Sequence, residues 1–364
     1  MNSETEIPTS NANISSSNQK NLNRLKVLAA LFTLFGIGLF AYFIYSIGFQ
    51  EILSGVGKVG FAGFAVVLIV YFLRLCMRAA AWNLSVYEPY KLTLKDTIPA
   101  VLIGEAMSSI IPLGILVSGT SKAIAVKNRV PLVVGFSSIA TENLFYSLVT
   151  AFFLVFGAFS FLRTFELDRG WIITIDVLIG VIIFLIFLGI LMVLRQWHFA
   201  SAICDRLYEK GFATKILESG RLHVRLFENF IYGFYRRYPK RFVPICLLEV
   251  GFHALGVFEV WYILSRIGEN LPSLYVSFLL ESVSRLITVV FKLIPFLVGV
   301  DEAGSQFITE TLAIGATIGV SLAIIRKGRI LFWTAIGLVF VVKRGFSFKE
   351  MSEIRHENND LTHE

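Results

Sequence analysis

Long apolar stretches separated by short polar ones dominate the chain. Each is about as long as the roughly 20 residues that an α-helix needs to cross the hydrocarbon core of a bilayer. That core offers the backbone no water, so helices are expected rather than open strands. The pattern predicts an all-α, polytopic membrane bundle with about six to eight spans. The main apolar stretches lie at residues 27–47, 59–82, 131–162, 171–194, 242–264, 271–300 and 303–325. The stretch 330–342 is too short to span alone, and we expect it to continue the preceding turn.

Two apolar segments are interrupted by helix breakers. Pro112, Gly114 and Gly119 break the segment 98–121, and Pro295 and Gly299 begin the break of the segment 293–319, in which Gly315 and Gly319 are further weak points. Broken or re-entrant backbone at membrane depth is tolerated only inside protein or beside a wet cavity. Paired breaks in the two halves of a chain are typical of inverted-repeat transporters, so we expect a loose repeat of that kind.

The polar parts of the chain predict its domain organisation. Residues 195–241 hold ten basic and four acidic residues, which indicates the cytoplasmic side. Apolar residues spaced along this segment predict an amphipathic helix on the membrane surface, with a solvated linker helix as the alternative. Residues 1–22 and 346–364 are expected to be polar tails around one transmembrane domain, 23–345. Basic residues before the first span predict a cytoplasmic N-terminus in a multi-pass protein of the cell (inner) membrane.

Composition excludes most other classes of protein. Of 364 residues, 55% are hydrophobic and 16% are charged, and the mean hydropathy is +0.71. Soluble domains carry about 25% charged residues, so a soluble fold is excluded. The net charge of +7 is explained by cytoplasmic loops, and we expect no nucleic-acid partner. The three cysteines are far apart and form no metal or disulfide pattern, and no cofactor or metal is predicted.

Charged residues inside the apolar stretches are the main chemical signal. Each costs at least about 2.5–3.5 kcal/mol at a helix centre, so they are expected to face one another or a hydrated path. Arg74 and Arg78 are the exception, because we expect them to snorkel to the interface. The others are Glu105, Glu142, Asp176, Glu249, Glu259, Glu281, Arg285 and Glu310.

One helical face carries Glu281, Arg285 and Lys292, which are spaced four and seven residues apart. The first two are expected to form an ion pair. The pattern leaves two interpretations open: a structural pair that locks two helices together, or the wall of a cavity that meets a charged head group.

Two further polar features carry weaker expectations. Thr120 or Ser121 could cap a short helix whose N-terminus, with Lys122, would suit a lipid phosphate, although plain capping without a ligand is the more frequent explanation. Asp301 and Glu302 are expected at a helix start, pairing with Arg326 or Arg329.

The sequence offers no catalytic constellation. No zinc-protease, nucleophile-elbow or Cys/His motif is present, so an enzyme is not expected. His253, four residues after Glu249, is expected to be a buried hydrogen-bond partner rather than a metal ligand.

Several motifs together carry a resemblance to a known family. They are Gly104-Glu105, Pro112-Leu113-Gly114, Ser118-Gly119-Thr120-Ser121-Lys122, Thr141-Glu142-Asn143, and the later Pro295, Gly299, Asp301-Glu302 and Arg326. Over about residues 25–345 the chain resembles the transmembrane, flippase-like region of lysylphosphatidylglycerol synthases, a family that includes hopanoid-associated membrane proteins. The resemblance implies movement of a lipid between leaflets. The soluble aminoacyl-transfer domain of the synthases is expected to be absent.

We therefore predict a phospholipid or isoprenoid-type lipid transporter, with membrane lipids of anionic or charged head group as partners. Two alternatives stay open: a lipid-modifying transferase within the membrane, or a non-catalytic scaffold for a separate lipid-synthesis enzyme. The residues expected along the transport path are Glu105, Pro112, Gly114, Gly119, Lys122, Glu142, Asn143, Glu281, Arg285, Lys292, Pro295, Gly299, Asp301, Glu302 and Arg326.

Overall fold

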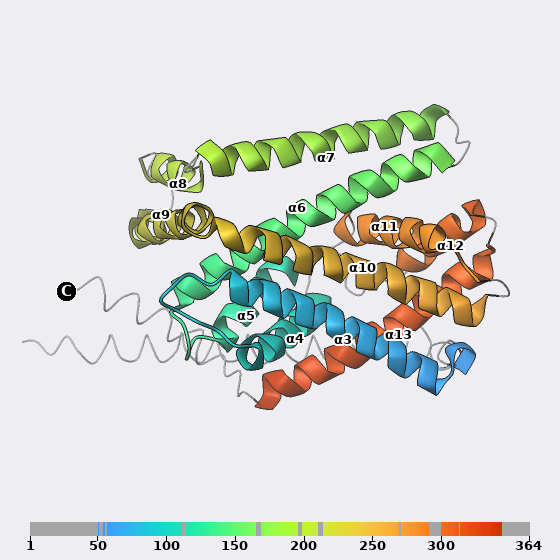
Figure 1. Ribbon diagram of the computed structural model, residues 1–364. Coiled ribbons are helices and arrows are strands. Elements are labelled where there is room, and N and C mark those ends of the chain that lie inside the picture. Colours follow the sequence, from blue (N-terminus) through green and yellow to red (C-terminus); the bar gives the residue numbers. More distant parts are fainter. Residues whose placement is uncertain are drawn as a thin grey trace, which may run out of the picture. The chain divides into compact units, whose positions relative to one another are not determined.

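The computed structural model is helical throughout the part of the chain that it describes. The described residues are 50, 54, 57–110, 114–164, 169–195, 199–209, 214–268, 271–290, 300–312 and 314–343, and none of them lies in a strand. The compact unit considered below covers Phe43–Phe340. The all-α fold class predicted from the apolar pattern is confirmed (Figure 1).

Four of the described helices are long and apolar enough to cross a membrane. They are α3 (Phe61–Leu84), α6 (Leu132–Thr164), α7 (Arg169–Arg195) and α10 (Phe242–Ile267). Each coincides with a predicted apolar stretch, and α3 and α10 lie side by side (Figure 1). The first predicted span, 27–47, lies outside the described residues.

Among the described residues, separate helices flank both predicted breaks, whose own residues 111–113 and 291–299 lie outside the description. Helix α4 (Leu94–Ile110) is followed by α5 (Gly114–Ala125), and α11 (Leu274–Val290) by α12 (Val300–Thr311). The members of each pair pack against each other. As described, α4 and α11 have 17 residues each, and α5 and α12 have 12 each. All four are shorter than the roughly 20 residues that a span needs.

Helix α13 (Ala316–Lys343) places charge in the middle of an otherwise apolar element. It begins directly after Gly315, whose φ of 108° is a conformation that side chains disfavour. Arg326, Lys327 and Arg329 lie inside this single helix. The expectation that 330–342 continues the preceding turn is confirmed.

The basic segment, for which we predicted an amphipathic helix, is described as two such helices. They are α8 (Phe199–Glu209) and α9 (Thr214–Arg237), followed by the short 3₁₀ helix η1 (Pro239–Arg241). Ser201 of α8 donates hydrogen bonds from its hydroxyl (2.7 Å) and its backbone N–H (3.3 Å) to Glu228 of α9. This buried contact lets the two helices pack on one another.

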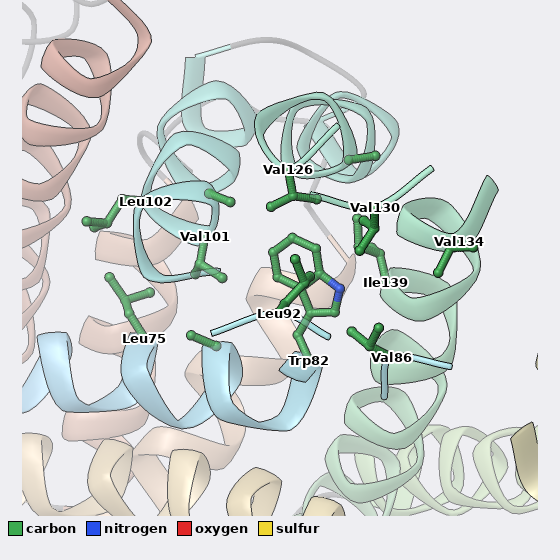
Figure 2. Close-up of a cluster of buried hydrophobic side chains, with 13 residues drawn as sticks. Leu75, Trp82, Val86, Leu92, Val101, Leu102, Val126, Val130, Val134 and Ile139 are labelled. Carbon is green, nitrogen blue, oxygen red and sulfur yellow. The ribbon is translucent and has the colours of Figure 1, made fainter. Parts of the chain in front are cut away.

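An apolar core fixes the first pair of short helices. Trp82 of α3 is buried, and its indole N–H donates to Ser138 of α6 at 2.9 Å. Figure 2 shows Leu75 and Val101 on one side of the indole ring, Ile139 on the other, and Val126 above it. The core therefore ties α3, α4, α6 and the segment after α5 into one rigid support.

Candidate functional site

A polar cavity of about 370 Å³ lies inside the bundle. Helices α3–α6 and α10–α13 all contribute side chains to it. Six cations line the wall together with two acids and several hydroxyl groups. The charged lining residues are Arg74, Arg78, Lys122, Arg285, Arg326, Arg329, Glu105 and Asp301.

Glu281 of α11 is the centre of the ion pairs beside this cavity. Its side chain is 0% exposed and accepts from Arg74 of α3 at 3.1 Å and from Arg285 of its own helix at 2.9 Å. Arg326 of α13 donates to its second oxygen. The predicted pair of Glu281 with Arg285 is confirmed, and the same carboxylate also joins α11 to α3 and α13.

Glu259 of α10 holds a second group of arginines. It accepts from Arg74 at 3.1 Å and from Arg329 of α13. Arg74 thus bridges two fully buried carboxylates on different helices. Buried ion pairs of this kind lock the geometry, because loss of one partner leaves an uncompensated charge.

Arg78 makes the third connection, between α3, α4 and α6. It donates to Glu142 and, at 3.1 Å, to the side-chain oxygen of Asn143, and its distance to Glu105 is 3.7 Å. Its guanidinium lies 4.3 Å from the ring centroid of Tyr146. The expectation that Arg74 and Arg78 snorkel to the interface is therefore wrong. Both are buried, because carboxylates on neighbouring helices supply the partners that water would otherwise provide.

Lys122 reaches the cavity from α5. It is only 4% exposed. A Cβ added at Gly104 of α4 would lie 2.8 Å from Lys122 Cε, so the glycine leaves room for the lysine stem. Gly119 also lines the cavity. Thr120 and Ser121 lie inside α5, which begins at Gly114, so their predicted role as caps is wrong.

The acids at the start of α12 have different surroundings. Asp301 lines the cavity, as does Arg326. Glu302 accepts from Lys327, a cation that we did not predict as its partner. The two arginines are instead held by Glu281 and Glu259. The helix start itself, with both acids in its first turn, is as predicted.

Glu249 and His253 lie one turn apart on α10, beside the cavity. His253 Nε2 is 3.0 Å from the Thr150 hydroxyl of α6, which confirms the predicted buried hydrogen bond. Its ring stacks on Phe153, with centroids 4.6 Å apart. Glu249 is 0% exposed, and neither carboxyl oxygen has a hydrogen-bond partner.

Two expected buried charges are exposed instead. Asp176 lies on an outward face of α7, and Glu310 of α12 is exposed and accepts from Gln306 at 3.1 Å. A single carboxylate near a helix end can reach polar surroundings, so it needs no buried partner. Of the predicted path residues, Pro112, Lys292, Pro295 and Gly299 lie outside the described residues.

Sequence reasoning did not place Arg74, Arg78, Arg329 and Glu259 in the site. Three of them carried a visible signal, because Arg74, Arg78 and Glu259 are charges within apolar stretches, whereas Arg329 lies between two such stretches. The spacing of Arg74 and Arg78, four residues apart, indicates that they share one face of a helix. It does not indicate whether that face packs against other helices or lies at the membrane interface.

An apolar cavity of about 780 Å³ is lined by residues of α6, α10 and α11. Its lining includes Phe152, Phe156, Phe258 and Phe278. The two cavities come close together at α10, where Phe252 lines the polar cavity and the next residue, His253, lines the apolar one. Among the described residues no group of three or more His, Cys, Asp or Glu side chains could hold a metal ion.

Comparison with known proteins agrees with the helical membrane character. No curated protein and no solved structure matches the chain. The family model described as lysylphosphatidylglycerol synthase TM region matches residues 26–337. This match covers most of the chain and includes every residue that lines the polar cavity. The protein therefore belongs to the family of the lysylphosphatidylglycerol synthase TM region, a family of membrane-embedded proteins.

Proposed function

We propose that the protein is a lipid transporter that moves lipids between the leaflets of the cell membrane. In this proposal the polar cavity takes the lipid head group, while the hydrocarbon tails stay in the apolar phase. The family supports a role connected with lipids. The cavity supports transport, because a hydrated path between apolar helices lowers the cost of moving a polar head group through the bilayer.

One observation carries the head-group assignment: cations line the cavity and most of their carboxylate partners lie behind them. Glu259 and Glu281 are 0% exposed and absent from the lining, whereas the arginines that they hold face the cavity. Carboxylates placed behind arginines orient the guanidinium groups and leave N–H donors for a ligand. The planar arrangement of these donors matches phosphate oxygens. An anionic phosphate head group is therefore the ligand that this wall favours.

The apolar cavity supports a lipid rather than a free phosphate. It lies against the same two helices as the polar cavity and is lined by phenylalanines and aliphatic residues. A lipid presents a charged end and an apolar end to its surroundings, and both kinds of surface lie next to each other here. A soluble anion would need only the first.

Transport is also favoured over the alternative of a lipid-modifying enzyme. Glu142, Glu259 and Glu281 are each engaged by one or more arginines. A carboxylate held in this way is a poor general acid or base, since its charge is already stabilised. The remaining alternative, a scaffold for a lipid-synthesis enzyme, would not require a cationic wall.

Flux of fluorescent phosphatidylglycerol across vesicles containing the purified protein tests the proposal. Lys122→Met and Arg326→Gln remove lining cations and are expected to lower the flux about tenfold, equal to about 1.4 kcal/mol of barrier. Arg129→Gln is the matched control, because Arg129 is an exposed cation that pairs with Asp96 at 3.3 Å.

Each alternative predicts a different outcome. Flux unchanged in folded cavity variants would overturn the transport role. A new lipid species detected by mass spectrometry would favour a transferase. Tolerance of both variants together with co-purification of a lipid-synthesis enzyme would favour a scaffold.

A further inference from the structure

Glu249 is a buried acid that the proposed head-group site does not use. It lies about two turns into α10, a helix long and apolar enough to cross a membrane. It is 0% exposed, and both of its carboxyl oxygens lack a hydrogen-bond partner. An ionised carboxylate without a partner is very costly in such surroundings, and the group takes up a proton instead. Glu249 is therefore accommodated as the neutral acid.

The surroundings of Glu249 explain why it has no cation of its own. It interacts electrostatically with Arg78 of α3, Glu142 of α6 and Lys122 of α5. Arg78 already donates to Glu142 and Asn143. From α11, Glu281 and Arg285 act on the neighbouring His253 rather than on Glu249.

A charge count links this proton to the polar cavity. Among the described residues, six cations line the cavity, and six carboxyl groups lie on its wall or directly behind it. The carboxyl groups are Glu105, Glu142, Glu249, Glu259, Glu281 and Asp301. With all of them ionised the set is neutral. With a proton on Glu249 it carries one positive charge, which one singly charged phosphodiester neutralises.

We propose that Glu249 is a proton-binding site that couples uptake of one proton to binding of one anionic lipid head group in the polar cavity. The inference rests on the proposed function and adds the proton as the ion whose gradient drives lipid transport. The proton that Glu249 takes up comes from the water that enters the cavity, and no other bond forms or breaks. Lipid and proton then move together as an electrically neutral pair.

Thermodynamic linkage gives this coupling a definite sign. If the protonated protein binds the anion more tightly, then anion binding raises the affinity of Glu249 for its proton by the same factor. Affinity for the anionic lipid is therefore highest at low pH and falls as pH rises, by at most about tenfold per pH unit for one linked proton. Binding of a zwitterionic lipid carries no such dependence.

The test measures binding of short-chain phosphatidylglycerol to the purified full chain from about pH 6 to about pH 9. Short-chain phosphatidylcholine is measured in parallel. The wild-type protein is expected to lose phosphatidylglycerol affinity with rising pH, whereas Glu249→Gln, which keeps the neutral shape, binds it equally at every pH. Glu310→Gln is the matched control, since it removes an exposed carboxylate of α12 and is expected to keep the wild-type dependence.

Calorimetry in two buffers of different ionisation enthalpy counts the protons directly. At the alkaline end of the pH range, where Glu249 of the free protein has lost its proton, about one proton per bound phosphatidylglycerol is expected for the wild type and none for Glu249→Gln. Should that variant fail to fold, the wild-type proton count alone decides, because a count of zero at every pH in the range overturns the proposal.

Failure of the coupling is distinguishable from failure of the transporter proposal. Phosphatidylglycerol binding without any pH dependence, or with a dependence that survives Glu249→Gln, overturns the coupling and leaves the head-group site standing. A dependence lost in His253→Gln but kept in Glu249→Gln assigns the proton to His253 and likewise overturns it. Absence of any preference for phosphatidylglycerol over phosphatidylcholine overturns the head-group site itself.

Discussion

The guanidinium of Arg78 donates two hydrogen bonds to one carboxylate oxygen of Glu142, at 2.9 Å from Nε and 2.7 Å from Nη2. The first residue lies on α3 and the second on α6, so the pair connects two of the apolar helices. Both side chains are buried. The partnership explains how an arginine is retained in the middle of an apolar element.

Breaking this pair on one side is expected to destabilise the fold. Glu142→Leu leaves Arg78 buried without its main partner, and the free energy of unfolding should fall by about 3–5 kcal/mol. The combined variant Arg78→Met, Glu142→Leu removes both charges and should recover much of this loss. Unfolding in detergent with increasing denaturant, followed by tryptophan fluorescence, gives the three values. Strictly additive effects of the two substitutions would contradict the coupling between them.

Glu281 is expected to be far more sensitive to neutralisation than a surface acid. Glu281→Gln weakens the contacts to Arg74, Arg285 and Arg326 at once, and we expect a loss of about 3 kcal/mol or more. Glu88→Gln is the matched control, because Glu88 is half exposed and pairs with Arg241 at 2.5 Å. Exposed pairs contribute only about 0–1 kcal/mol. Equal loss of thermal stability in the two variants would show that the buried pairs do not hold the helices together.

Two glycines should respond oppositely to alanine. A Cβ at Gly256 of α10 would lie 2.5 Å from Glu281 Oε1 and 2.9 Å from Arg74 Nη2, so Gly256→Ala should cost about 1–3 kcal/mol by overpacking the ion pairs. A Cβ at Gly180 of α7 would meet nothing within 4 Å. Gly180→Ala should therefore be neutral or stabilising by up to about 1 kcal/mol. The midpoint of thermal unfolding checks both, and a destabilised Gly180→Ala with unchanged Gly256→Ala would refute the close approach.

Helix α8 should loosen when its contact with α9 is removed. The hydroxyl of Ser201 donates to Glu228 at 2.7 Å, and both residues are buried. Ser201→Ala is expected to destabilise this contact by about 1 kcal/mol. Hydrogen exchange should then be faster, by about fivefold, in the amides of Phe199–Glu209. The amides of α10 serve as the internal reference, and equal acceleration there would indicate global rather than local loosening.

The apolar helices and their approximate ends follow from the sequence. Bilayer thickness fixes the length of a spanning helix, so an apolar stretch such as 59–82 or 131–162 predicts α3 or α6 within a few residues. The breaks between α4 and α5 and between α11 and α12 were also predictable, because proline and glycine disfavour a continuous helix. The ion pair of Glu281 with Arg285 was also predictable from the sequence, because it lies within one helix and depends only on the helical repeat.

The partners of the other charges were decided by the tertiary structure alone. Arg74 and Glu259 are 185 positions apart, and Arg78 and Glu142 are 64 apart. Side-chain packing across the whole bundle decides which helices contact each other and how each is rotated about its axis. The apolar pattern of a single helix does not carry this information. The sequence determined that charges must be satisfied inside the apolar helices, because hydrocarbon does not solvate them. Only the packing decided that cations face the cavity, that acids stand behind them, and that Glu249 is left without a partner.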